Sequence, residues 1–242
     1  MSYKSIKQAI ISVGGKGTRL KGITGDTPKP LYPIAGISCF ERSLIKLKYF
    51  GILEVYLLTS YNKDFFESKK EYFINKYGIK LLLFQEKIPL GECGGLWNIK
   101  QYLDEDFLFL GGDLIWDVDI QRAYEFHKKN DAAVTLFTHL SSHPKDSDLI
   151  VESQAKEVKE FLCKPHSANN LHLAYLGNAG MSIINKKLVE ITGPPTNKIS
   201  LFKYLSQFRG EKNLRIFSYN TTEFIKDIGT PDRFKKTENL LS

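Results

Sequence analysis

Two basic residues near the start of the chain stand in a setting rich in glycine and proline. The stretch "VGGKGTRLKGITGDTPKPLYPI" (13–34) places Arg19 just after three glycines and Lys29 between two prolines. The three glycines are Gly14, Gly15 and Gly17. Glycines leave backbone N–H groups unobstructed, and arginine can donate two parallel hydrogen bonds to phosphate oxygens. Flanking prolines stiffen the backbone that carries a lysine, so its point charge can be placed accurately. This pattern indicates a phosphate-binding loop.

Neither of two common nucleotide-binding loops matches this stretch. A Walker loop requires GxxxxGK followed by Ser or Thr, and a dinucleotide-binding loop requires GxGxxG. The glycines taken alone fit a simple turn between a strand and a helix. Lys29 taken alone fits a surface lysine in a proline turn.

Two aspartates farther along the chain could provide a metal site. Asp113 and Asp227 each lie near a glycine, at the end of an expected strand or at a turn. Carboxylate oxygens together with phosphate oxygens and water are the ligands that Mg²⁺ prefers. Either aspartate by itself fits a turn residue or a helix cap.

Strand-like and helix-like segments alternate through the first half of the chain. Apolar runs predict strands over 8–13, 54–60, 80–86, 106–113 and 132–138. Helical patterns predict helices over 40–51, 63–77, 94–103 and 119–130. Apolar strands between helices are typical of a parallel sheet covered on both faces, which is an α/β fold. Ligands of such sheets bind at the carboxyl ends of the strands, so the loops after Val13, Phe84 and Leu110 should share one edge.

The second half has a less regular pattern. Strands are expected over 147–153, 157–165, 176–184 and 214–219, and helices over 200–208 and 230–241. Thr230 is the expected N-cap of the last helix, with proline at its first position. Because no repeat or linker divides the chain, we expect a single domain over 1–242.

Composition restricts the class of partner. The 242 residues carry a formal charge of +7, and the 34 basic residues are spread along the chain. The charge suggests anionic partners, which include nucleic acid, an acidic membrane surface and phosphorylated small molecules, but its even spread favours a diffusely charged surface over nucleic-acid binding. No segment approaches the ~20 apolar residues of a membrane span. Three scattered cysteines indicate neither disulfides nor a zinc site, so a reduced, cytoplasmic protein is expected. The oligomeric state, including a homo-oligomer, stays open.

The full pattern of motifs resembles the sugar-1-phosphate nucleotidylyltransferases, which condense a nucleoside triphosphate with a sugar 1-phosphate and release pyrophosphate. "GGKGTRL" followed by "TPKPL" resembles the signature of that family. Later segments agree in order: "FQEKIPLGECGGL" (84–96), "LFLGGDLI" (108–115), "EFLCKP" (160–165), "GNAGMSII" (177–184) and "FIKDIGTPDRF" (224–234). The resemblance implies a Rossmann-like three-layer sandwich with a mostly parallel central sheet, of the nucleotide-diphospho-sugar transferase type. It also implies a nucleotide-binding half (about 1–130) and a sugar-phosphate-binding half (about 131–242).

Within that family, "HLSSHPKDSDLIVES" and "YLGNAG" look most like the guanylyltransferases for D-glycero-D-manno-heptose 1-phosphate. Near relatives of those enzymes act on mannose 1-phosphate. The resemblance therefore implies GTP as the nucleotide and a heptose or mannose phosphate as its partner. A heptose substrate would connect the protein with lipopolysaccharide or capsule biosynthesis.

The resemblance assigns roles around the nucleotide. Arg19 would bind the departing β,γ-phosphates, Lys29 would stabilise charge on the α-phosphate, and Asp113 and Asp227 would hold Mg²⁺. The nucleotide-binding residues would be Gly14, Gly15, Gly17, Thr18, Gln85 and Gly91, the last two facing the base.

The resemblance also assigns a sugar side. Lys164 would bind the phosphate of the sugar, while Asn178 and Gly180 would line the sugar pocket. Glu152 would meet sugar hydroxyls. Asn178 fits a hydrogen-bonded turn equally well, and Glu152 fits an exposed strand end.

The chain departs from the family pattern at three positions that bear on substrate preference. Cys163 stands where glutamate is frequent, and Glu92 and Cys93 replace small residues.

Two other classes of protein remain as alternatives. Asp117 and Asp119 form the DxD pattern of sugar-nucleotide-dependent glycosyltransferases, although Asp119 also fits a helix cap. A non-catalytic nucleotide-sugar-binding regulatory subunit would keep the fold without turnover. His139, His143 and Asp146 have spacing that a transition metal accepts, but a polar loop explains them more simply.

Overall fold

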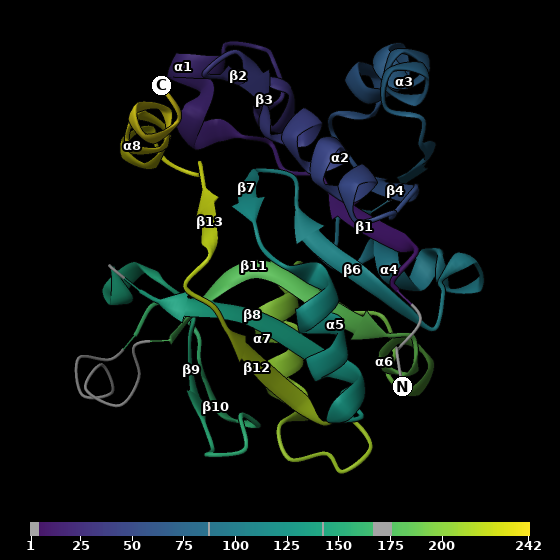
Figure 1. Ribbon diagram of the computed structural model, residues 1–242, viewed down its shortest axis with the longest axis vertical. Helices are drawn as coiled ribbons and strands as arrows, with labels where there is room; N and C mark the ends of the chain where they lie inside the picture. Colours follow the sequence, from purple (N-terminus) through teal and green to yellow (C-terminus); the bar gives the residue numbers. More distant parts are fainter. Residues whose placement is uncertain (1–4, 87, 142, 167–175) are drawn as a thin grey trace.

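A mixed nine-stranded sheet takes strands from both halves of the chain (Figure 1). The computed structural model describes residues 5–86, 88–141, 143–166 and 176–242. The main path of the sheet has the order β10-β9-β11-β6-β1-β4-β5, and β8 joins it through β11 and carries β12. These strands are β1 (Gln8–Ser12), β4 (Glu54–Thr59), β5 (Lys80–Gln85), β6 (Asp106–Gly111), β8 (Val134–Leu140), β9 (Leu149–Glu152), β10 (Val158–Leu162), β11 (Leu176–Asn185) and β12 (Ile216–Asn220).

Strand direction changes at β11. Strands β6, β1, β4 and β5 run parallel, as expected from apolar strands separated by helices. β11 is antiparallel to β6, β8 and β9, and β8 is parallel to β12. The central sheet is therefore mostly parallel with an antiparallel insertion, which confirms the expected fold class.

Helices cover both faces of the sheet and produce three layers. One face packs against α2 (Cys39–Tyr49), α3 (Lys63–Tyr77) and α5 (Ile120–Lys129), and the other against α4 (Gly95–Asn98), α6 (Lys187–Ile191) and α7 (Leu201–Leu205). Along β1, Ala9 and Ile11 enter the first core while Ile10 enters the second. A strand that is apolar on both sides can only lie in the middle of such a sandwich.

Side-chain caps fix the starts of several helices. Ser38 accepts a hydrogen bond from the N–H of Glu41 at 3.2 Å and caps α2. Asp119 caps α5 in the same way, and Thr230 caps α8 (Pro231–Leu241), as expected from the sequence. The helix expected over 94–103 is shorter, because α4 gives way to a 3₁₀ turn at Lys100–Tyr102. Two glycines open that segment and lower its helix propensity.

A small antiparallel sheet joins distant parts of the chain beside the main sheet. It pairs β7 (Leu114–Asp117) with β13 (Phe224–Asp227), and it lies next to α1 (Lys21–Thr24) and α8 (Figure 1). A third apolar cluster fills the space between these elements: Leu20, Ile34, Cys39, Ile115, Ile228 and Phe234. A short hairpin, β2 (Pro33–Ile34) with β3 (Ile37–Ser38), leads into α2.

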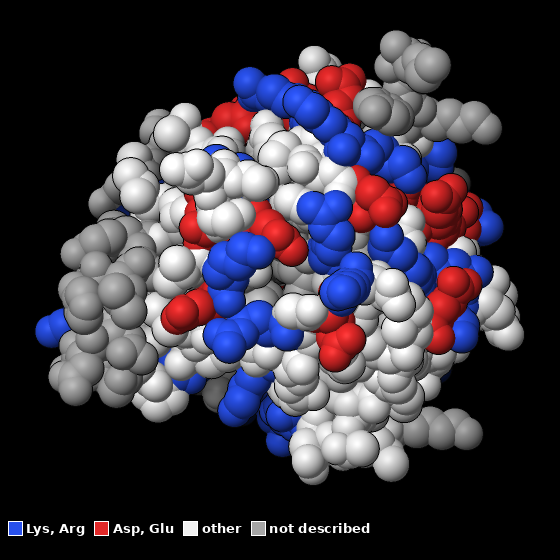
Figure 2. Space-filling view, turned by 90° about the horizontal axis from the view of Figure 1, so that it is seen from below, with Lys and Arg blue, Asp and Glu red and all other residues white. Residues whose placement is uncertain are grey.

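The surface charge is dispersed. On the face shown in Figure 2, lysine and arginine side chains alternate with acidic groups rather than forming one continuous basic field. This agrees with the interpretation of the net charge as spread over the surface. Among the described residues, no helix has both the length and the apolar character needed to cross a bilayer.

Candidate active site

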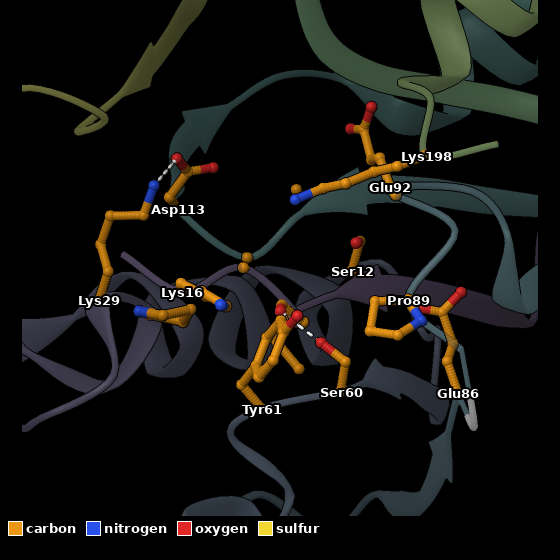
Figure 3. A pocket seen from close by; sticks show the side chains of 17 residues that line it. Ser12, Lys16, Lys29, Ser60, Tyr61, Glu86, Pro89, Glu92, Asp113 and Lys198 are labelled. Carbon is orange, nitrogen blue, oxygen red and sulfur yellow. Dashed lines mark hydrogen bonds and ion pairs between the residues drawn. The ribbon is translucent and has the colours of Figure 1, made fainter. Parts of the chain in front are cut away.

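A cavity of about 260 Å³ opens at the carboxyl ends of the parallel strands. Its walls come from the loops after β1, β4, β5 and β6, together with one segment of the second half. The loops after Val13, Phe84 and Leu110 thus meet at one edge, as their positions in a parallel sheet predict. Figure 3 shows Lys29 and Asp113 at one end of the cavity and Glu86 and Pro89 at the other.

The glycine loop presents free N–H groups to this cavity. Ser60 donates to the carbonyl of Gly14 at 2.5 Å, and Asn62 donates to the carbonyl of Gly15 at 2.9 Å. These bonds hold the loop carbonyls toward β4. Within the described part of the chain, no hydrogen bond occupies the N–H groups of Gly14 and Gly15. Such N–H groups suit an anion, as the sequence predicts.

Lys29 contacts the carboxylate of Asp113 across the cavity wall. Lys29 begins a 3₁₀ turn after Pro28, and Pro30 in that turn is buried. The Lys29 side chain is 18% exposed and that of Asp113 25%. Nothing in the sequence indicates that these two residues are in contact. Their contact places the Lys29 ammonium group beside a predicted metal ligand at the cavity.

Both predicted metal carboxylates converge beside Gly229. A Cβ atom on Gly229 would lie 2.7 Å from Oδ1 of Asp227 and 3.8 Å from Oδ2 of Asp113. It would also lie 3.6 Å from Nη2 of Arg19. Glycine at this position therefore leaves space that any other residue would fill.

Asp227 is held as an anion by its neighbours. Its Oδ1 accepts from the N–H of Gly229 at 2.9 Å and from Nη1 of Arg233 at 3.0 Å. Burial by itself would raise the pKa of Asp227, but these two donors lower it below its ordinary value. An ionised carboxylate is the form that binds a divalent cation.

The residues present fit a magnesium ion. Two carboxylates meet beside a glycine, and the described residues bring no third His, Cys, Asp or Glu to this point. Magnesium suits such an incomplete set, because it keeps waters and binds phosphate oxygens.

The end of the cavity opposite Lys29 and Asp113 is lined by Glu86 and not by Gln85. The amide of Gln85 lies 3.5 Å from the carbonyl of Ser60, and Gln85 is not part of the cavity wall. Oε1 of Glu86 is buried and has no hydrogen-bond partner among the described residues. Burial raises the pKa of Glu86, although the N–H groups of Leu90 and Gly95 oppose this. This orphaned oxygen faces Gly94, where a Cβ atom would lie 2.8 Å from it.

Gly91 joins the two halves of the chain at the cavity. It has φ +99°, and a Cβ atom there would lie 2.1 Å from the carbonyl oxygen of Ile199. The N–H of Ile199 donates to Leu90 at 3.0 Å, which continues the contact. The neighbouring Lys198 extends its ammonium group into the cavity (Figure 3).

Glu92 lies beneath the segment that carries Lys198. Its carboxylate accepts a hydrogen bond from the N–H of Leu201 at 3.2 Å. Burial raises the pKa of Glu92 to about 7, and the charges of Asp113 and Asp148 add to this. Around neutral pH this side chain is therefore partly protonated, which limits its repulsion of phosphate.

Glu92→Gln should stabilise the protein increasingly as the pH rises above about 4.5, with most of the gain present by pH 7. The carboxyl group ionises near pH 7 when folded but near its ordinary value of 4.5 when unfolded. Ionised Glu92 therefore lowers the free energy of unfolding as pH rises through this window. We expect the variant to gain roughly 2 kcal/mol at pH 8.5 and almost nothing at pH 4.5, measured by urea unfolding. Glu71→Gln, on the exposed side of α3, is the control. An equal gain at both pH values would contradict the assignment.

The predicted sugar-side residues divide into two groups. Asn178 and Gly180 lie in an irregular part of β11, and Gly180 packs against Leu114, next to Asp113. Lys164 lies outside the cavity wall, beside Asp146. Glu152 lies at the far end of β9, in the hairpin turn with Lys156, away from these residues.

The remaining predicted nucleotide residues lie at the rim. Gly17 has φ +65° and introduces the 3₁₀ turn Thr18–Leu20, whose buried Leu20 anchors it. Thr18 and Arg19 are exposed and do not line the cavity, although Arg19 reaches the carboxylate pair near Gly229.

The DxD pattern does not form a paired carboxylate site. Asp119 accepts from the N–H of Arg122 at 3.0 Å as a helix cap, and Asp117 pairs with Lys46 at 2.6 Å on the surface. His139 and His143 belong to no metal-binding group among the described residues.

Several residues that line the cavity or pair with predicted site residues have no local sequence signal. Lys198 and Arg233 are two basic residues among 34, and Asp146 lies in a polar loop. Glu86 could have been found, because it directly follows Gln85 in the segment assigned to the base.

The chain belongs to the nucleotidyl transferase family, whose model matches residues 8–241. The mannose-1-phosphate guanylyltransferase of Mycobacterium tuberculosis is 28% identical over 228 residues, which are 93% of this chain and 62% of that protein. The mannose-1-phosphate guanylyltransferase catalytic subunit beta of Drosophila pseudoobscura is 29% identical over 231 residues, which are 94% of this chain and 60% of that protein. This chain thus spans about three fifths of the length of both relatives.

A solved structure shows the same fold. HddC from Yersinia pseudotuberculosis, complexed with GMP-PN, matches with a TM-score of 0.76 and 23% identity. The match covers 98% of this chain and 100% of that one.

Proposed function

We propose that this protein is a nucleotidylyltransferase that joins GTP to a sugar 1-phosphate of the mannose or heptose type. One observation carries this proposal: the glycine loop, Lys29 and Asp113 line one cavity, and Asp227 meets Asp113 beside Gly229. The family and the names of the two curated relatives support it. Because of these proposed substrates, we also propose a cytoplasmic location for the protein.

The reaction needs positioning and charge neutralisation more than acid–base catalysis. A sugar phosphate with its second pKa near ~6 is already a dianionic nucleophile at neutral pH. The free N–H groups of the glycine loop would hold the triphosphate, and Lys29 would transfer its contact from Asp113 to the α-phosphate. Arg19 would bind the departing pyrophosphate. Holding two anions in line is the main task of such a site.

Asp113 and Asp227 are the residues that would hold Mg²⁺. When bound, the ion would neutralise charge on the phosphate oxygens.

The guanine base is favoured by the carboxylate at the other end of the cavity. The Glu86 side chain lines the cavity, and when ionised it can only accept hydrogen bonds. Guanine offers two adjacent donors, N1–H and the N2 amino group, whereas adenine offers a donor beside an acceptor.

Glu86→Gln should reduce discrimination in favour of GTP. We expect kcat/KM for GTP to fall roughly 10- to 100-fold, because a hydrogen bond to a charged group contributes about 1.5–3 kcal/mol. The ratio of kcat/KM for GTP over that for ATP should fall with it. Gln85→Ala is the matched control and should change neither value more than about twofold. If Gln85→Ala changed kcat/KM for GTP strongly and Glu86→Gln did not, the base contact would belong to Gln85.

The proposed function is tested by a matrix of substrates. Each nucleoside triphosphate is combined with mannose 1-phosphate, a heptose 1-phosphate or glucose 1-phosphate in the presence of Mg²⁺, and pyrophosphate release is measured. We expect GTP with mannose or heptose 1-phosphate to give the highest kcat/KM. Hydrolysis of a nucleotide-sugar or glycosyl transfer without pyrophosphate would favour a glycosyltransferase, and binding without turnover would favour a regulatory subunit.

A further inference from the structure

Arg233 links two carboxylates through the two arms of its guanidinium group. Nη1 donates to Asp227 at 3.0 Å, and Nη2 donates to Oδ2 of Asp146 at 2.9 Å. The Arg233 side chain is 20% exposed, whereas that of Asp146 is 62% exposed. One arm is thus held by a partly buried carboxylate and the other by a carboxylate open to solvent.

A second cation lies on the same exposed carboxylate. Nζ of Lys164 is 3.9 Å from Oδ1 of Asp146 and donates to its carbonyl oxygen at 3.2 Å. Lys164 follows β10, Arg233 lies on α8, and Asp146 ends the 3₁₀ turn Pro144–Asp146 after β8. Three separate segments therefore bring two cations and one displaceable anion together.

In the free protein the carboxylate of Asp146 occupies this position, and its ion pairs are weak. An exposed ion pair contributes little to stability, because water and salt screen it. A phosphate monoester carries about two charges and three acceptor oxygens, so it can accept from Nη2 of Arg233 and from Nζ of Lys164 at the same time. A phosphate therefore competes well with the single carboxylate for Arg233 and Lys164.

We propose that Arg233 is a second phosphate-binding residue for the sugar phosphate, beside Lys164, and that Asp146 holds its place in the free protein. On binding, Nη2 exchanges Asp146 for a phosphate oxygen while Nη1 stays on Asp227. Arg233 then ties the sugar phosphate to the carboxylate proposed for the metal. This inference rests on the proposed function, because it names the phosphate of that substrate.

The exchange predicts opposite effects for two substitutions. Arg233→Gln removes the cation and should raise the KM for mannose 1-phosphate at least ~10-fold, with the KM for GTP changed less than about threefold. Asp146→Asn removes the competing charge and should lower the KM for mannose 1-phosphate about three- to tenfold. If the Arg233–Asp146 pair has only a structural role, both variants should raise the KM for mannose 1-phosphate.

Arg122→Gln is the matched control for Arg233→Gln. Arg122 donates to Glu223 at 2.9 Å and so forms a similar ion pair outside the site. This variant should leave the KM for mannose 1-phosphate unchanged. Arg233→Lys keeps the charge without the fork and should fall between wild type and Arg233→Gln.

Direct binding separates this inference from the proposed function. The dissociation constants of inorganic phosphate and mannose 1-phosphate are measured by ³¹P NMR on the full chain without nucleotide. Tighter binding by Asp146→Asn and weaker binding by Arg233→Gln support the inference even if no substrate pair releases pyrophosphate. Weaker or unchanged binding by Asp146→Asn overturns it even if the wild type is an active transferase. Because Asp146 is exposed, that variant should fold, so the test does not depend on Arg233→Gln being stable.

Discussion

Replacement of Lys29 by alanine should lower the kcat of nucleotidyl transfer by roughly 100- to 1,000-fold. Lys29 enters the cavity from a turn that begins after Pro28 and contains the buried Pro30, so its position is set before substrate binds. Its partner Asp113 lies beside the place where the phosphates would bind. Loss of one preorganised charge removes stabilisation that appears mainly in the transition state.

Single-turnover kinetics with GTP and the preferred sugar phosphate would measure this effect. The free energy of unfolding should change by only about 1 kcal/mol, because both partners of the Lys29–Asp113 pair are partly exposed. Lys46→Ala is the matched control, since Lys46 also pairs with an aspartate, Asp117, but on the surface. Near-normal pyrophosphate release from Lys29→Ala in a folded protein would remove Lys29 from the mechanism.

The sequence predicted those parts of the fold that depend on local pattern. The strand at Gln8–Ser12 and the helix at Lys63–Tyr77 lie where the apolar and helical periodicities place them. The caps at Asp119 and Thr230 were also visible, because a capping side chain and the N–H it binds lie within three residues. Strand direction could not be predicted, because the run 132–138 is equally apolar in a parallel or an antiparallel strand.

The site was predictable only where its residues are close in sequence. Glycines and prolines around Lys29 indicate a loop, because glycine permits unusual backbone conformations and proline fixes φ. The meeting of Asp113 with Asp227 depends on pairing of β7 with β13, and both strands are only four residues long. Arg233 and Lys198 reach the site through tertiary packing that leaves no local pattern.

The apolar neighbours of the site residues explain how the distant parts are held together. Leu20 follows Arg19, and Ile228 follows Asp227, and both enter the same buried cluster as Phe234 of α8. Burying those side chains contributes roughly 1.5–3 kcal/mol each. The charged partners therefore converge because hydrophobic packing places them, not because their charges attract one another.

Asp227→Asn should produce a loss of turnover as large as that of Lys29→Ala, roughly 100-fold or more in kcat. Asparagine keeps the size of the side chain and can still accept from the N–H of Gly229, so the fold should persist. It removes the negative charge whose pKa the surrounding donors hold below its ordinary value. The affinity for Mn²⁺, measured by electron paramagnetic resonance in the presence of GTP, should fall at least ~10-fold.

Asp117→Asn is the control that also tests the DxD alternative. Asp117 and Asp227 lie at opposite ends of the same two-stranded sheet, so both changes perturb β7 and β13 alike. Of the two, only Asp227 meets Asp113 and Arg19 beside Gly229. We therefore expect Asp117→Asn to retain turnover and Mn²⁺ affinity within about twofold of wild type. If Asp117→Asn lost both while Asp227→Asn kept them, the metal would belong to the DxD pattern and the protein to a different class of transferase.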